Sequence, residues 1–405
     1  MTELKKYPDY HLFLRSGLPD LSGLPWVAPL REWTAYCDNL VDVPHGVSRH
    51  PVLFINLEGF VYAIKELPVG VAEKEYHALT KLEDLRLPAV LPVGFIHTTN
   101  PDDRRSLLIT RHLEYSIPYR SIFQSNSLIT YRQHFLDAIS SLLVQLHLAG
   151  VYWGDCSLSN TLFRRDAGTL QAYLVDAETL EFFPNYFPPA HRHQELDIME
   201  ENINGELSDL HSINQLMDNI SLHEVGGYIR VRYQKLWEEI TREDIVNPTE
   251  QYIIQERIEA LNSLGYSVGE IELYPTQNGN QLRLRVVVTD RNYHRDQLVK
   301  LTGLEAEEMQ AQKMMNEILE VRALLSTDEN RSIPISVASY HWLKNIYEPT
   351  LHYLGSLIGT DMNLSELYCQ VLEHKWYMSE KAHRDVGHQV AAEDYLENYD
   401  GISKL

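Results

Sequence analysis

The chain has 405 residues, of which 44% are hydrophobic and 23% charged, a balance typical of globular domains and not of disordered chains. That length exceeds one ordinary core, so we expect about two to three domains. The formal net charge of −22 argues against non-specific binding to nucleic acid or to acidic membrane surfaces, although a local lysine and Mg²⁺ can still admit one nucleotide to a cleft.

The cysteines and the apolar stretches indicate the compartment. Cys37, Cys156 and Cys369 lie far apart and fit neither a disulfide framework nor a paired-cysteine metal site, which favours a reducing compartment. The first residues, MTELKKYPDYHLFL, lack the apolar segment of a signal peptide. The most apolar stretch, Ala138–Trp153, is interrupted by polar residues and falls short of a membrane span. We therefore predict a cytoplasmic protein with no membrane span and no nucleic-acid partner.

Strand patterns begin near Pro51, after a segment (1–45) that the sequence leaves unassigned. Two runs rich in β-branched and aromatic residues, PVLFINLEG and GFVYAIKEL, predict strands. Leucines at three-residue spacing predict a helix over Val71–Asp84, and LPAVLPVGFI and SLLITRHLE predict two further strands. This order lacks the regular alternation of a doubly wound sheet and indicates an α+β fold.

The clearest helical pattern covers Tyr131 to Gly150, where apolar residues recur at three- and four-residue spacing before a terminal glycine. Beyond it we expect a loop (WGDCSLSN), a short strand (TLFRRD) and a second strand (LQAYLVDAE). The following segment, FFPNYFPPAHRH, is dense in proline and aromatic residues and predicts irregular structure.

The pattern changes after about residue 220. Two helical stretches, YIRVRYQKLWEEI and EQYIIQERIEALNSLGY, precede the runs VGEIELYPT and QLRLRVVVT, whose QNGN connection is a strong hairpin signal. A long amphipathic helix from about Leu304 to Leu325 and further helices follow. We therefore predict a first domain over residues 1–220 and a smaller α+β domain, with a β-hairpin and long helices, over residues 221–395.

Two residues of one predicted loop, Asp155 and Asn160, are the first candidates for catalysis. Phosphoryl transfer from ATP to a hydroxyl needs a carboxylate beside that hydroxyl, oxygen ligands for Mg²⁺ and a cation on the phosphates. The Asp-x4-Asn spacing alone is weak evidence for a catalytic site, because a chain of this length contains about one such pair by chance. The context strengthens it, since Lys65 ends a strand, Glu75 follows on a helix, and Asp176 ends a later apolar strand. This ordered set predicts a phosphotransferase.

The same residues resemble the protein-kinase superfamily, and most closely its bacterial lipopolysaccharide-kinase-like branch, over roughly residues 40–215. VYAIK is similar to the family's Val-Ala-Ile-Lys strand, which implies that Lys65 contacts the ATP phosphates and that Glu75 pairs with it. GDCSLSN resembles the catalytic loop, which implies that Asp155 is the base and Asn160 a metal ligand. DAE stands in the place of Asp-Phe-Gly, which implies that Asp176 binds Mg²⁺.

The resemblance also implies a two-lobed fold, with an N-lobe over about 40–115 and a C-lobe over about 116–220. LLITRHLE resembles the strand that leads into the hinge, so backbone groups from Thr110 to Leu113 would meet the adenine. Glu178 resembles the extra acid of small-molecule kinases. HGVSRHP is the nearest candidate for the glycine-rich loop, where Ser48 and Arg49 would cap the phosphates.

Several departures keep two hypotheses open. No Gly-x-Gly-x-x-Gly loop is present, Gly154 replaces the usual catalytic-loop arginine, and Ser157 replaces a lysine that neutralises the transferred group. One hypothesis is an ATP- and Mg²⁺-dependent enzyme that phosphorylates a hydroxyl of a saccharide, lipid or protein. The other is a pseudokinase that binds nucleotide and holds a protein partner through its C-terminal domain. That domain resembles the C-terminal domain of uncharacterised bacterial proteins, which implies architecture and no chemistry.

Three further features have simple interpretations. His147 is expected to pack under the loop and not to bind a ligand. The HRHQE run at His191–Glu195 has metal-like spacing but lacks the other ligands of a zinc site. Cys156 is expected to be a packing residue, because no cationic cluster is evident that would lower its pKa.

Overall fold

The structure is a computed structural model that describes residues 2–6, 9–16, 19–43, 49–100, 104–124, 132–184, 187–212, 222–242, 244–246, 270–275, 282–287, 293–355 and 362–397. The chain divides into two compact units. The first comprises Met1–Arg164 and Ala172–Trp237, and the second comprises Arg165–Gln171 and Glu238–Leu405. The predicted boundary near residue 220 lies among residues 213–221, outside the described part, so the predicted domain limits stay a prediction.

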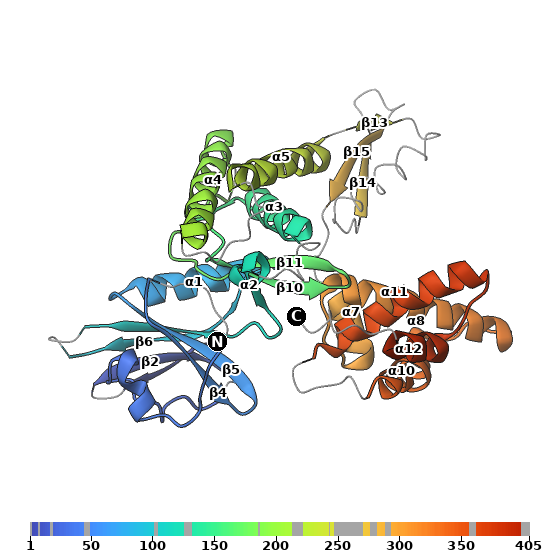
Figure 1. Ribbon diagram of the computed structural model, residues 1–405, viewed down its shortest axis with the longest axis horizontal. Helices are drawn as coiled ribbons and strands as arrows, with labels where there is room; N and C mark the ends of the chain where they lie inside the picture. Colours follow the sequence, from blue (N-terminus) through green and yellow to red (C-terminus); the bar gives the residue numbers. More distant parts are fainter. Residues whose placement is uncertain are drawn as a thin grey trace. The chain divides into compact units, whose positions relative to one another are not determined.

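The first unit begins with a seven-stranded antiparallel sheet (Figure 1). Its strands, in spatial order, are β1 (Thr2–Lys6), β2 (Tyr10–Arg15), β6 (Leu91–Thr98), β7 (Ser106–Arg111), β5 (Phe60–Leu67), β4 (Val52–Leu57) and β3 (Leu40–Val41). The sequence left residues 1–45 unassigned, yet three of the strands, β1, β2 and β3, come from this segment. In β2, buried residues alternate with half-buried ones, so one face of the strand joins the core around Trp26 and Trp33.

Helix α1 (Val71–Asp84) confirms the helix predicted from the leucine spacing, and it packs against β6 and β7. The short helix η1 (Leu30–Ala35) carries Trp33, whose ring meets that of Trp26 edge-on at 5.1 Å. Strands β4 and β5 form a hairpin with Glu58 and Gly59 as its two turn residues, both at positive φ. Such a turn matches the twist of the paired strands and fixes their register, which places Lys65 on β5.

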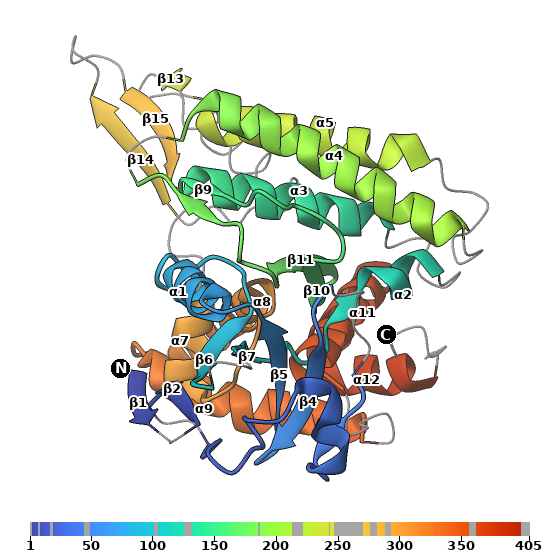
Figure 2. The same ribbon diagram turned by 90° about the vertical axis from the view of Figure 1, so that its left-hand side faces the viewer.

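The rest of the first unit is mainly helical. Its elements are β8 (Ile117–Pro118), α2 (Tyr119–Gln124), α3 (Arg132–Leu148), β9 (Val151–Tyr152), β10 (Thr161–Asp166), β11 (Thr169–Leu174), β12 (Glu181–Phe182), α4 (Pro189–Ser212) and α5 (Leu222–Thr241). Helix α3 confirms the strongest helical pattern. Gly150 follows it at φ +72°, where a Cβ atom would lie 2.2 Å from the carbonyl oxygen of Phe183. Both views show α3, α4 and α5 side by side (Figure 2).

One expectation for this part was wrong. The segment FFPNYFPPAHRH was expected to be irregular throughout, but α4 begins within it at Pro189. Proline is tolerated in the first turn of a helix because that turn leaves its backbone N–H groups without intrahelical partners. The carbonyl of Pro188 accepts the N–H groups of His191 and Arg192, which starts the helix.

The second unit combines a three-stranded sheet with a helical bundle. The strands are β13 (Asp244–Val246), β15 (Leu282–Val287) and β14 (Glu270–Pro275), in that spatial order, and the antiparallel β14–β15 pair confirms the predicted pairing. The QNGN connection and the run EQYIIQERIEALNSLGY lie outside the described residues. The helices are α7 (Tyr293–Thr302), α8 (Glu308–Asp328), α9 (Ile335–Trp342), the π-helical turn η3 (Leu343–Tyr347), α10 (Glu348–Tyr353), α11 (Leu364–Ala382) and α12 (His388–Glu397).

The predicted long helix is α8, which begins four residues later than expected. Glu307 and Gln310 form a capping box that sets this start, because each side chain accepts the other's backbone N–H. Met314, Ile318 and Trp342 belong to the bundle core. Within the described residues, no helix combines the length and apolarity needed to cross a bilayer.

Candidate active site

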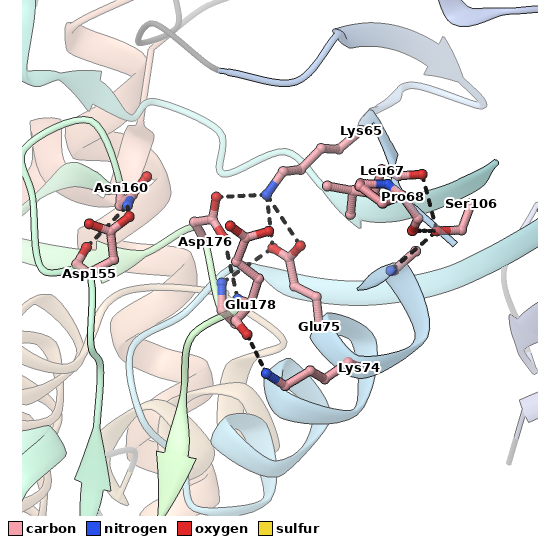
Figure 3. A network of polar contacts seen from close by, with 12 residues as sticks. Lys65, Leu67, Pro68, Lys74, Glu75, Ser106, Asp155, Asn160, Asp176 and Glu178 are labelled. Atoms are coloured by element: carbon pink, nitrogen blue, oxygen red, sulfur yellow. Dashed lines mark hydrogen bonds and ion pairs between the residues drawn. The ribbon is translucent and has the colours of Figure 1, made fainter. Parts of the chain in front are cut away.

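Lys65, Glu75 and Asp176 meet at the centre of the site (Figure 3). The Nζ of Lys65 lies 3.2 Å from Oε2 of Glu75 and 2.7 Å from Oδ2 of Asp176. The other Glu75 oxygen accepts the backbone N–H of Ala177 at 3.3 Å. Strand alternation explains the direction of Lys65, since Tyr62 and Ile64 enter the core while Ala63 and Lys65 face a cavity.

Together, burial and neighbouring charges raise the pKa values of both Glu75 and Lys65. Burial raises the pKa of Glu75 to about 7, because its desolvation outweighs the attraction of the Lys65 ammonium. Burial alone would lower the pKa of Lys65, but the Glu75 and Asp176 carboxylates outweigh it and the net pKa is raised. Lys65 is therefore protonated at neutral pH, and its ammonium group can bind a polyanion.

Asp155 and Asn160 lie on the loop between β9 and β10. The Asn160 amide donates to the Asp155 backbone carbonyl and to its Oδ2, both at 3.1 Å. Asn202 of α4 donates to the other carboxylate oxygen at 3.0 Å and to the carbonyl of Cys156 at 3.1 Å. Two side-chain amides thus fix the direction of the Asp155 carboxylate without placing a positive charge on it.

The strands β10 and β11 bring Asn160 and Asp176 to the same region. Asn160 directly precedes β10, Asp176 follows β11, and the N–H of Val175 donates to the carbonyl of Asn160 at 3.0 Å. Oxygen atoms of Glu75, Asp176 and Glu178 lie within 4.8 Å of one another. Carboxylate and amide oxygens are the ligands that Mg²⁺ prefers, so these residues fit a magnesium ion.

A cavity of about 240 Å³ joins these residues, and Lys65, Glu75, Asp155, Asn160 and Asp176 all line it. Its lining also includes the apolar residues Val52, Ala63, Leu108, Leu162 and Val175. The predicted hinge residues Thr110 and Leu113 also line the cavity, as does Arg49. Ser48 lies outside the described residues.

The sequence reasoning missed two acids of α4 that hold the loop. Glu195 is fully buried and accepts the N–H groups of Trp153 at 3.0 Å and Gly154 at 2.7 Å. Glu206 accepts those of Leu158 at 2.7 Å and Ser159 at 3.0 Å. Spacings of seven and four residues place Glu195, Asn202 and Glu206 on one face of the helix, so this polar stripe was the available signal.

Three residues in the loop or directly beneath it, His147, Cys156 and Gly154, have surroundings that explain their residue types. His147 does pack beneath the loop, with Nε2 2.9 Å from Glu195 and Nδ1 2.7 Å from the Tyr233 hydroxyl, and burial lowers its pKa. Cys156 is buried, and burial raises the pKa of its thiol well above the usual value. Gly154 has φ +80°, and a Cβ there would lie 3.2 Å from the carbonyl oxygen of Thr179, so arginine would be strained at this position.

Two sequence-family models match separate parts of the chain. Residues 60–202 match the sequence model of the lipopolysaccharide kinase (Kdo/WaaP) family, and residues 235–399 match that of a domain of unknown function, DUF4032. No curated protein matches the chain. A solved structure described as "WaaP in complex with acyl carrier protein" is similar at 16% identity and a TM-score of 0.37, over 62% of this chain and 98% of that chain.

The chain is an α+β protein with a two-lobed, protein-kinase-like part. It joins a part that resembles the lipopolysaccharide kinase family to a smaller C-terminal α+β domain of unknown function, as the sequence motifs implied.

Proposed function

We propose that the first unit transfers the terminal phosphoryl group of ATP, with Mg²⁺, to a hydroxyl of a saccharide, lipid or protein acceptor. The observation that carries this proposal is the convergence of Lys65 with Glu75 and Asp176, at 3.2 and 2.7 Å, in a cavity that Asp155 and Asn160 also line. Residues separated by up to 111 positions supply a cation, a group of carboxylates and a loop carboxylate to one space.

Each residue has one task in this reaction. The acceptor oxygen attacks the terminal phosphorus, the bond to the bridging oxygen of ADP breaks, and the hydroxyl proton passes to Asp155. Lys65, held by Glu75, binds the phosphate oxygens. Asp176 and Asn160 would hold Mg²⁺, which when bound neutralises charge on the phosphates. Their acidic and amide oxygens suit that ion.

The apolar residues of the cavity lining fit a purine ring. Val52, Ala63 and Leu162 offer flat aliphatic contacts, and the chain from Thr110 to Leu113 offers backbone groups to the ring edge. Arg49 extends the phosphate-binding side, where Ser48 was also predicted to act. These contacts support a nucleotide as the donor.

Replacement of Asp155 tests the enzyme assignment. With Mg-ATP, the wild-type chain should show slow autophosphorylation or ATP hydrolysis, and Asp155→Ala should lower that rate about 100- to 10,000-fold, the usual contribution of a general base. Asp84→Ala, which changes an exposed acid at the end of α1, is the matched control. Activity that survives in Asp155→Ala would refute the assigned role.

One observation favours the pseudokinase as a second candidate. Ser157 is buried, and its hydroxyl lies 3.2 Å from that of Ser159, so this position supplies no cation to a transferred phosphoryl group. A pseudokinase would still be stabilised by ATP. Thermal stabilisation by nucleotide without any turnover or metal dependence would favour this candidate over the enzyme.

A further inference from the structure

The turn between β10 and β11 is built into the second unit. Residues Arg165–Gln171 belong to that unit, while both strands run on into the first. Asp166 is buried, and its carboxylate accepts the N–H groups of Met309 at 3.1 Å and Gln310 at 2.9 Å. These N–H groups belong to the first turn of α8 and have no backbone partner within the helix, and that of Gln310 is shared between Asp166 and the capping-box side chain of Glu307. An acid 143 positions earlier in the chain therefore satisfies the start of this helix.

A second acid holds the backbone of the turn itself. Glu366 of α11 accepts the N–H groups of Ala167 at 2.8 Å and Gly168 at 3.3 Å, and the side-chain amide of Gln310 at 2.8 Å. Lys313 of α8 donates to the carbonyl of Ala167 at 3.1 Å. All of the groups around Glu366 donate hydrogen bonds to it. The side chain at this position must therefore only accept, as a carboxylate does.

The outer half of this hairpin lies beyond the third strand of its sheet, and its turn residue Ala167 packs into the core of the second unit. Strand β8 pairs only with Leu162 and Phe163 of β10, so the hairpin is two-stranded from Arg164 outward. An isolated two-stranded ribbon is marginally stable in water. The turn residues Ala167 and Gly168 both have positive φ, which adds a conformational cost for the alanine. The bonds to Asp166 and Glu366 offset that cost.

The other end of the same hairpin carries the metal-holding residues of the candidate active site. Asn160 precedes β10 by one residue and Asp176 follows β11 by two, and the two strand ends are joined by the Val175 to Asn160 hydrogen bond at 3.0 Å. Six strand residues span roughly 20 Å. Displacement or fraying at the turn would therefore reach the site through a short, continuous pair of strands.

We propose that the domain of unknown function positions the metal-holding end of the active site, and that Asp166 and Glu366 are the positioning residues that fix the β10–β11 turn for this purpose. The roles of Asn160 and Asp176 rest on the proposed function. The anchoring of the turn, and its effect on order at Val175, do not depend on catalysis.

The first test measures the Mg²⁺ dependence of activity in the full chain. Glu366→Gln keeps the size of the side chain but turns an amide N–H₂ toward N–H donors, so the turn should loosen. We expect the Mg²⁺ concentration for half-maximal activity to rise about tenfold, as for the loss of residues that support metal ligands. Glu320→Gln, an exposed acid of α8, is the control. A variant that merely lost folded protein would show a lower maximal rate at an unchanged Mg²⁺ midpoint, and that result would overturn the proposal.

The second test needs no activity and separates this inference from the proposed function. Amide hydrogen exchange of Val175, whose N–H is bonded to Asn160, should quicken about tenfold in Glu366→Gln and stay unchanged in Glu320→Gln. If Glu366→Gln folds poorly, Lys313→Met removes the bond to Ala167 together with one positive charge, and Val175 exchange should quicken to a smaller extent. Unchanged exchange at Val175, alongside faster exchange at Ala167, would refute the coupling. Faster exchange without any ATP turnover would support it and refute the enzyme assignment.

Discussion

Glu75 is a buried acid whose charge depends on its neighbours, and this makes the first unit sensitive to pH. Its pKa is about 7 in the folded chain and near 4.5 without the fold. A carboxyl whose pKa is raised by folding contributes stability that is fully present below pH 4.5 and is lost as the pH rises through 7. Proton binding by Glu75 therefore favours the folded first unit in acid.

We predict that the free energy of unfolding falls by about 3 kcal/mol between pH 4.5 and pH 8 on account of Glu75. Glu75→Gln should flatten this part of the profile, because the amide does not titrate. Denaturant unfolding at a series of pH values measures the difference. Asp166 in the second unit also has a pKa raised by burial to about 7, so the informative quantity is the wild-type profile minus that of Glu75→Gln. Asp84→Asn is the control, and identical profiles for Glu75→Gln and wild type would contradict the prediction.

At the scale of elements, helix α4 determines the shape of the catalytic loop. Its acids Glu195 and Glu206 accept backbone N–H groups near the two ends of the loop, and Asn202 between them holds Asp155. Asn160 bonds to Asp155 within the loop, but the backbone N–H groups of Trp153, Gly154, Leu158 and Ser159 all donate to these two acids of the helix. The loop geometry is thus imposed by a helix more than forty positions later.

We predict that Glu195→Gln lowers kcat by up to about 100-fold, because the N–H₂ of glutamine would oppose the donors of His147, Trp153 and Gly154 and shift the loop that carries Asp155. The KM for ATP should change much less, since Lys65 and Glu75 lie on other elements. Steady-state kinetics resolve the two constants. Glu201→Gln on the exposed side of α4 should leave both unchanged. An increase in KM with an unaltered kcat would argue against the positioning role of Glu195.

Elements whose own sequence shows a clear pattern of apolar residues were predictable. Elements that form only by pairing with segments distant in the sequence were not. Helices α1 and α3 were predictable from apolar residues at three- and four-residue spacing, and strands β4 and β5 from runs rich in β-branched and aromatic residues. The N-terminal strands β1 and β2 were missed because they are short and punctuated, and become strands only by adding to the edge at β6.

The same distinction applies to the site. Lys65, Asp155 and Asp176 lie in short motifs that can be recognised in the sequence itself. Glu195 and Glu366 act through backbone N–H groups 41 and 199 positions away, and a buried acid on a helix looks no different in sequence from a solvated one. Burial, which distinguishes them, is a property of the folded chain.

At the scale of the whole molecule, charge opposes the proposed ligand. The formal net charge is −22, and the cavity lining contains the five acids Glu75, Asp155, Asp176, Glu178 and Glu206 against the three cations Arg49, Lys65 and Arg111. Both the long-range field and the cavity therefore repel a free nucleotide polyanion. The ion pairs of Lys65 with Glu75 and Asp176 further reduce the positive charge that it offers.

This excess of negative charge predicts that Mg²⁺ raises the affinity for the nucleotide and that added salt speeds its association. Isothermal titration with ATP plus EDTA should give an affinity at least about tenfold lower than with Mg-ATP, because carboxylates such as Asp176 turn from repulsive groups into ligands once the ion is present. Raising the salt from about 0.01 M to 0.1 M shortens the screening length from about 30 to 10 Å and should speed association with Mg-ATP, the reverse of the usual effect at a basic site. Equal affinity with and without Mg²⁺ would show that the acidic group does not hold the metal, and association slowed by salt would show that Lys65 and the two arginines dominate the field at the cavity.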